Sequence, residues 1–99
     1  MSKPVVFLLH LGDDVQGCAF ECPGCGILHA PPVTGPRAWG FNHDLLRPTL
    51  TPSLLVRWTE GPEHTPRVCH SHVRDGQIEF LSDCTHALAG KTVPLAPVE

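Results

Sequence analysis

The segment Cys22-Pro23-Gly24-Cys25-Gly26 is the most informative stretch of this chain. Two cysteines separated by two residues, with glycines that allow a tight turn, are typical of a zinc knuckle, in which backbone N–H groups reach both thiolates. A redox pair of the thioredoxin type is the competing interpretation, but that motif opens a helix. Here Pro31 and Pro32 follow closely and forbid one. The segment therefore favours metal binding.

The composition is that of one small globular domain covering residues 1–99. A hydrophobic fraction of 41% is too high for a disordered chain, yet 99 residues bury only a thin core, which a bound metal would stabilise. The five cysteines are an odd number, and we see no signal-peptide cleavage site near the N-terminus. A metal site is thus favoured over a disulfide framework, and we expect a cytoplasmic protein.

Charge and hydropathy exclude several classes of protein. The net charge of -3 gives no basic surface for nucleic acid or for an anionic membrane. No apolar run approaches the roughly 20 residues of a membrane span. Eleven prolines and nine glycines argue against long helices.

Short apolar runs separated by turn residues predict a mostly β fold. We expect a small single-domain antiparallel sheet with a zinc-ribbon-like knuckle and a C-terminal β-hairpin, whose turn is Asp75-Gly76. A polar loop is expected at 59–66, and one helical turn at 85–89, capped by Gly90. The predicted strands cover residues 5–11, 17–21, 27–29, 38–41, 50–58, 68–74, 77–81 and 92–98.

The hairpin turn fixes a register that can be worked out from the sequence. With a two-residue turn, Arg74 faces Gln77, and successive pairs follow outward along both strands. Because side chains alternate between faces, Cys69 and Cys84 share one face if the second strand persists, while His70 and Asp83 share the other. A bulge would shift this register.

These patterns predict a tetrahedral zinc site that joins the knuckle to the hairpin. Its expected ligands are Cys22, Cys25, Cys69 and Cys84. Three histidines at ligand spacing from a cysteine are the competing donors: His29, His72 and His86. The alternative for Cys69 and Cys84 is that they bind no metal and are buried small hydrophobic residues.

A second cluster of polar residues suggests nucleophilic catalysis. His70 is the candidate base, oriented by Asp83, and Ser53 is the candidate nucleophile, because Ser71 points to the face opposite His70. The simpler interpretation is that Ser53 closes a proline turn and that His70 and Asp83 form a surface pair. A catalytic zinc is the other enzymatic route, but no H-E-x-x-H motif or zinc-deaminase signature is present.

Several separated motifs resemble a known family of proteins. They cover roughly residues 18–95 and include the knuckle, Pro48-Thr49-Leu50-Thr51-Pro52-Ser53, Cys69-His70-Ser71 and Asp83-Cys84-Thr85-His86. The family consists of small phage and prophage proteins of unknown function that often carry the label ammonia monooxygenase. Nothing in this chain supports that label, since it has no membrane span and no copper-type histidine constellation. More distant relatives in bacterial ubiquitin-like conjugation operons resemble zinc-containing serine peptidases, which implies catalytic roles for Ser53 and His70.

Two hypotheses of function follow from the sequence, both with bound Zn²⁺. The first is a zinc-stabilised hydrolase of peptidase type, which requires Ser53 Oγ and His70 to lie within hydrogen-bond reach and a protein substrate. The second is a non-enzymatic interaction module, phage-encoded and acting in the host bacterial cytoplasm, that binds a host protein complex. It requires those side chains to lie far apart and an exposed apolar patch instead.

Overall fold

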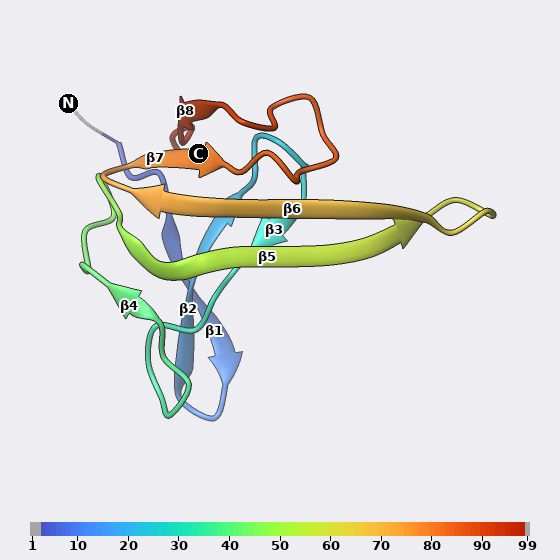
Figure 1. Ribbon diagram of the computed structural model, residues 1–99. Helices are drawn as coiled ribbons and strands as arrows, with labels where there is room; N and C mark the ends of the chain where they lie inside the picture. Colours follow the sequence, from blue (N-terminus) through green and yellow to red (C-terminus); the bar gives the residue numbers. More distant parts are fainter. Residues whose placement is uncertain (1–2, 99) are drawn as a thin grey trace.

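The computed structural model describes residues 3–98, which form an all-β structure of two antiparallel sheets (Figure 1). One sheet has the order β1-β2-β3, and the other has the order β4-β5-β6-β7-β8. The predicted fold class is therefore confirmed. The strands are β1 (Phe7–Gly12), β2 (Val15–Glu21), β3 (Leu28–His29), β4 (Gly40–Phe41), β5 (Leu50–Glu60), β6 (Thr65–Arg74), β7 (Gln77–Phe80) and β8 (Thr92–Pro94).

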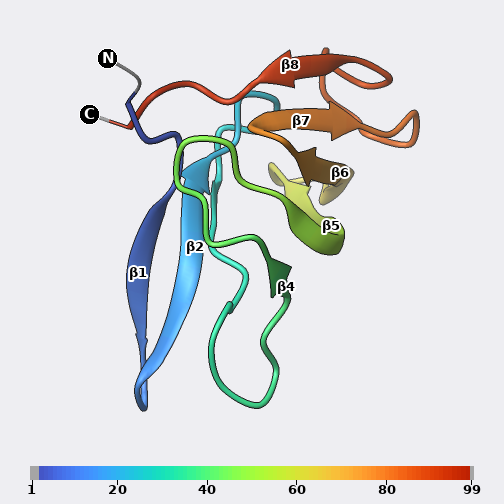
Figure 2. The same cartoon turned by 90° about the vertical axis from the view of Figure 1, so that its left-hand side faces the viewer.

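The core lies between the two sheets. Figure 2 shows the β1–β2 hairpin beside the larger sheet, and the buried apolar side chains come from both. Phe20 of β2 and Phe80 of β7 are the largest of them, each about 1% exposed. Burial of these rings supplies much of the hydrophobic stabilisation of a chain this small.

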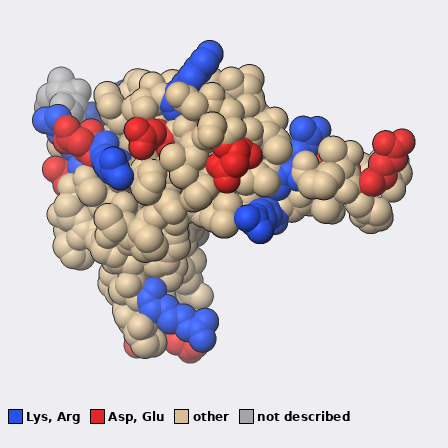
Figure 3. Space-filling view, viewed as in Figure 1, with Lys and Arg blue, Asp and Glu red and all other residues tan. Residues whose placement is uncertain are grey.

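The longest strands, β5 and β6, form an arm that extends beyond the core. They pair from Leu50 to Glu60, and their tip projects well past the smaller sheet (Figures 1 and 3). We expected residues 59–66 to be a polar loop, but the pairing continues to Glu60 and Thr65, so that only 61–64 form the turn. Figure 3 shows that charged side chains of both signs decorate the arm.

Strand β6 alternates between a buried face and a partly exposed face. Cys69, Ser71 and Val73 are buried, whereas His70 and His72 are half-buried on the opposite face. This is the period-two pattern that a sheet with one face on the core requires. It separates the thiol of Cys69 from the imidazole of its neighbour, His70.

The register computed from the turn at Asp75-Gly76 is confirmed. Arg74 pairs with Gln77, and the next pairs outward follow the expected order as far as Ser71 and Phe80. The structure differs beyond Phe80, where β7 ends and the chain turns, closed by a hydrogen bond from the Cys84 N–H to the Leu81 carbonyl.

The segment after this turn also differs from the sequence-based expectation. Residues 85–89 form turns and not a regular helical turn, and β8 is shorter than the predicted strand. Residues 3–98 contain no helix, and therefore none that is long and apolar enough to cross a membrane.

The hairpin turn yields a stability prediction. Gly76 has a φ of +78°, and an added Cβ would lie 3.3 Å from both the Cα of Arg47 and the carbonyl oxygen of Leu46. Gly61 has a similar φ of +73° but open space around it. We expect Gly61→Ala to lower the free energy of unfolding by about 1–2 kcal/mol, the cost of left-handed backbone. Gly76→Ala should lower the free energy of unfolding further, because its Cβ also crowds Leu46 and Arg47; urea denaturation of both variants measures the difference. Equal losses of stability in the two variants would show that this crowding does not destabilise the protein.

Candidate functional site

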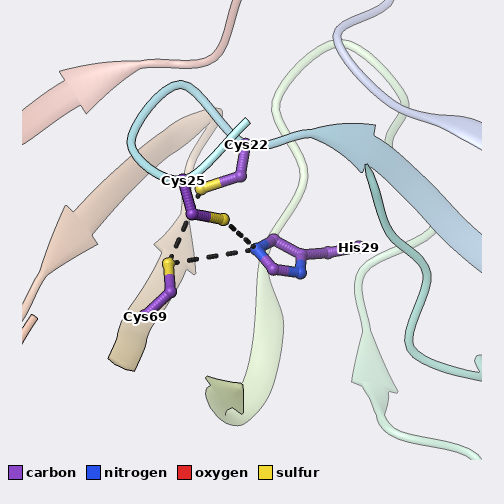
Figure 4. Close-up of side chains that lie close together, drawn as sticks. All are labelled: Cys22, Cys25, His29 and Cys69. Carbon is purple, nitrogen blue, oxygen red and sulfur yellow. Dashed lines mark hydrogen bonds between the residues drawn. The ribbon is translucent and has the colours of Figure 1, made fainter. Parts of the chain in front are cut away.

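Four side chains from the two sheets converge on one point below the knuckle. The thiols of Cys22, Cys25 and Cys69 and the imidazole of His29 place one donor atom each within 4.8 Å of all the others (Figure 4). Cys22 and Cys25 come from the loop between β2 and β3, His29 from β3 and Cys69 from β6. Three of the four are buried, and Cys25 is half-buried. This group could hold a metal ion.

The spacing of the donor atoms matches a tetrahedral site. Thiolates at 2.3 Å from a central Zn²⁺ lie about 3.8 Å from one another and about 3.6 Å from an imidazole nitrogen at 2.0–2.1 Å. Cys22 Sγ and Cys69 Sγ are 3.7 Å apart, and His29 Nε2 lies 3.4 Å from Cys25 Sγ and 3.9 Å from Cys69 Sγ. The donor types and their separations therefore both fit a four-coordinate ion.

The ionisation of the three thiols is interdependent. A hydrogen bond from the Cys69 thiol lowers the pKa of Cys22, and the same contact raises the pKa of Cys69. Burial raises the pKa of Cys25. Without a cation, the cluster thus favours one thiolate that is hydrogen-bonded by a neighbouring thiol. A divalent ion would supply the charge that allows all three to ionise, with release of their protons.

A second group of donors overlaps the first at Cys69 and includes Cys84 and His86. His86 Nδ1 accepts a hydrogen bond from the Leu88 N–H at 3.2 Å, so Nε2 carries the proton and donates to Cys69 Sγ at 3.5 Å. The ring packs directly over Gly24, where any side chain would collide with it. His86 is therefore placed to support a metal ligand by hydrogen bonding.

The structure differs from the predicted four-cysteine set at Cys84, which lies outside the four-donor group. Its Sγ accepts a hydrogen bond from the His70 N–H, with the nitrogen at 3.2 Å. The same thiol donates a hydrogen bond to the His70 carbonyl oxygen at 3.1 Å. Because β7 ends at Phe80, Cys84 does not continue the strand, although its thiol still lies within 4.8 Å of Cys69 Sγ. The thiol therefore bonds both backbone groups of His70, as a residue of a neighbouring strand would do.

On the opposite face of β6, Ser53, His70 and Asp83 form a chain of hydrogen bonds. Ser53 Oγ lies 3.0 Å from His70 Nε2, and His70 Nδ1 lies 3.1 Å from Asp83 Oδ2. A carboxylate can only accept, so Nδ1 carries the proton and Nε2 accepts the serine O–H. The His70 side chain is 23% exposed and that of Asp83 is 52% exposed. Solvent therefore reaches this chain of groups.

Three elements position these side chains. Leu55 of β5 pairs with His70 of β6, so Ser53, two residues earlier, lies on the same side of the sheet as the imidazole. Ser53 lies in the segment between Leu50 and Leu54 where the pairing with β6 is irregular, and its Oγ reaches His70 Nε2. The two thiol hydrogen bonds of Cys84 hold the neighbouring Asp83 beside His70. By contrast, Ser71 is completely buried on the core face, away from His70.

A serine, a histidine and a carboxylate in this order of contact are the arrangement on which serine hydrolases are built. Comparison with protein families matches residues 2–81 to one described as bacterial ubiquitination-like system serine protease (BubE), and the chain belongs to this family. The match includes Ser53, His70 and the four-donor group, and it ends just before Asp83. No curated protein and no solved structure matches the chain.

The four-donor group predicts which cysteines hold a metal. Cys22→Ser, Cys25→Ser and Cys69→Ser should each reduce the bound metal well below one ion per chain, because each removes a donor of the group. Cys84→Ser, the matched control, should retain it. Metal content by mass spectrometry of the reduced, purified protein measures this. Loss in Cys84→Ser, with retention in His29→Ala, would restore the four-cysteine set.

Removal of the ion should destabilise the whole chain. Metal binding contributes about 10–16 kcal/mol in small zinc domains, more than a thin core supplies, so a chelator should lower the melting temperature by more than about 20 °C. Differential scanning calorimetry with and without the chelator measures this. An unchanged transition would show that the core alone holds the two sheets together.

Proposed function

We propose that this protein is a zinc-stabilised serine hydrolase that cleaves a polypeptide. Ser53 is the nucleophile, His70 the general base and Asp83 the residue that orients the imidazole. The observation that carries the proposal is the 3.0 Å contact between Ser53 Oγ and His70 Nε2. Membership of a serine protease family supports the same reaction.

The reaction follows from the direction of the hydrogen bonds. His70 Nε2 takes the proton of Ser53 as Oγ attacks the carbonyl carbon of the scissile amide. The tetrahedral intermediate collapses, His70 returns the proton to the leaving amine, and an ester on Ser53 remains. A water molecule, deprotonated by His70, then attacks the ester, and Ser53 recovers its proton as the acid product leaves.

Asp83 contributes by fixing the ring of His70. Its Oδ2 accepts the Nδ1–H, which selects the tautomer with a free Nε2 lone pair and stabilises the imidazolium formed during attack. Asp83 is half exposed, so water can replace part of this hydrogen bond when the carboxylate is removed. We therefore assign Asp83 a smaller share of the rate than Ser53 or His70.

The metal has a structural role in this proposal. Four protein donors complete a tetrahedral Zn²⁺ site and leave no position for a catalytic water. Three thiolates and one imidazole are a donor set typical of zinc. Because Cys69 and His70 are adjacent on β6, holding the thiol in place also fixes the strand that carries the base.

The distance between serine and histidine discriminates between the two functions that the sequence suggests. A non-enzymatic interaction module has no requirement for Ser53 Oγ to face His70 Nε2, or for Asp83 to face Nδ1. Both contacts are present, and they favour the hydrolase. The family description further supports a substrate that belongs to a bacterial ubiquitination-like system.

A small fluorophosphonate probe tests the nucleophile without knowledge of the substrate. Ser53 Oγ should displace fluoride from the probe, and mass spectrometry should locate the adduct on Ser53. Ser53→Ala should abolish the adduct, and His70→Ala should slow its formation by at least about 10³-fold, because the hydroxyl loses its base. Asp83→Asn should give an intermediate rate.

Two variants serve as matched controls for this experiment. Ser82→Ala removes an exposed serine beside Asp83, and His72→Ala removes the next histidine on the same face of β6. Both should react at the rate of the unmodified sequence. An adduct on any other residue, or none on Ser53 in the metal-loaded protein, would overturn the proposal.

A further inference from the structure

The outer edge of β5 has no partner strand next to Ser53. Strand β4 pairs only with Leu50 and Thr51, and among residues 3–98 no other strand pairs with that side of β5. The edge from Ser53 toward the tip of the arm is therefore free, and the surface beneath the arm is open in Figure 3. An open edge of this kind is a template for another strand.

The hydrogen bonds of β6 show which backbone groups this edge presents. The N–H and C=O of His70 are both directed away from β5, to the thiol of Cys84 and the N–H of Leu81. Opposed residues in an antiparallel pair either exchange both hydrogen bonds or neither. His70 is opposite Leu55, so the N–H and C=O of Leu55 point outward, to the free edge.

The same reasoning applies one step further along the strand. Val68 directs its N–H to Thr85 Oγ1 at 3.0 Å, and its C=O accepts the Thr85 N–H at 2.9 Å. Arg57, which is opposite Val68, therefore also directs its N–H and C=O outward. Leu55 and Arg57 thus present two donor–acceptor pairs at the spacing of a β-ladder, starting two residues from Ser53.

An apolar groove of about 270 Å³ runs along this edge. It lies between β5 and the edge strand β3 of the other sheet, and Leu28 and Leu55 in its walls are 51% and 46% exposed. The volume is sufficient for one or two aliphatic side chains. The other apolar residues that line the groove are Ile27, Ala30, Pro31, Trp39, Leu54 and Val56.

We infer that the free edge of β5 binds the substrate as an extended strand, with an apolar side chain of the substrate in the groove between β3 and β5. This inference rests on the proposed function and specifies its substrate class: an unfolded segment of polypeptide with an apolar residue near the scissile bond. Alternating N–H and C=O groups are complementary only to another extended backbone. A strand added at about 4.8 Å from β5 passes beside Ser53.

Peptide phosphonates that react with serine test the inference. Acetylated tetrapeptide diphenyl phosphonates, with Leu or Asp at each position in turn, should react at Ser53 with loss of phenoxide. At one position, Leu should react at least about 10-fold faster than Asp, because that side chain enters the groove. N-methylation of alternate backbone amides should slow the reaction by about 10-fold or more, and N-methylation of the intervening amides should change it less than about two-fold.

A substitution in the groove provides an independent readout. Leu28→Asp places a charge in the groove wall and should lower the ratio of the Leu-peptide rate to the rate of the small fluorophosphonate. Leu8→Asp is the matched control, since Leu8 is 46% exposed on β1 and does not line the groove. The ratio should be unchanged in the Leu8 variant.

The small probe separates failure of this inference from failure of the proposed function. If the probe labels Ser53 but peptides show neither side-chain preference nor alternation, the hydrolase stands and the edge-binding inference is overturned. If the probe does not react, both fail. A stable dimer in sedimentation, with an insensitive peptide series, would assign the edge to a second copy of the chain and also overturn the inference.

Discussion

The contact between the knuckle thiols and Cys69 is the interaction on which the rest of the structure depends. His29 belongs to the smaller sheet, Cys22 and Cys25 to the loop between its strands β2 and β3, and Cys69 to the larger sheet. The cluster therefore joins two sheets that share only a thin apolar core. Three thiols this close together, two of them buried and one half-buried, are unfavourable as three thiolates. The same arrangement becomes favourable around a divalent cation.

The alternation of side chains along β6 converts this structural cluster into support for a second site. Cys69 points into the cluster and His70 points to the other face, toward Ser53 and Asp83. A strand fixed at one residue has little freedom at the next. The two sites are thus separate in chemistry but share one stretch of backbone. Strand β5, which β4 covers only at Leu50 and Thr51, supplies both the serine and the free edge beside it.

Much of this arrangement was predictable from the sequence, because local rules govern it. The Asp75-Gly76 turn fixed the pairing of β6 with β7, and period-two alternation then separated Cys69 from His70. The knuckle spacing identified Cys22 and Cys25, and the spacing of His29 marked it as an alternative ligand. The grouping of Ser53 with His70 required the pairing of β5 with β6, which the sequence did not specify, and drew on family resemblance.

Other parts followed from tertiary contacts that no short pattern encodes. The prediction for Cys84 assumed that β7 continues past Phe80, whereas the chain turns there and the thiol bonds to the His70 backbone. The two hydrogen bonds require an S–H that donates and a sulfur that accepts. Oxidation or alkylation of this one sulfur removes the donor, so the position of Asp83, in the loop that follows β7, depends on the chemical state of the Cys84 thiol. A reducing environment keeps Cys84 as a free thiol and so preserves both hydrogen bonds that hold this loop against β6.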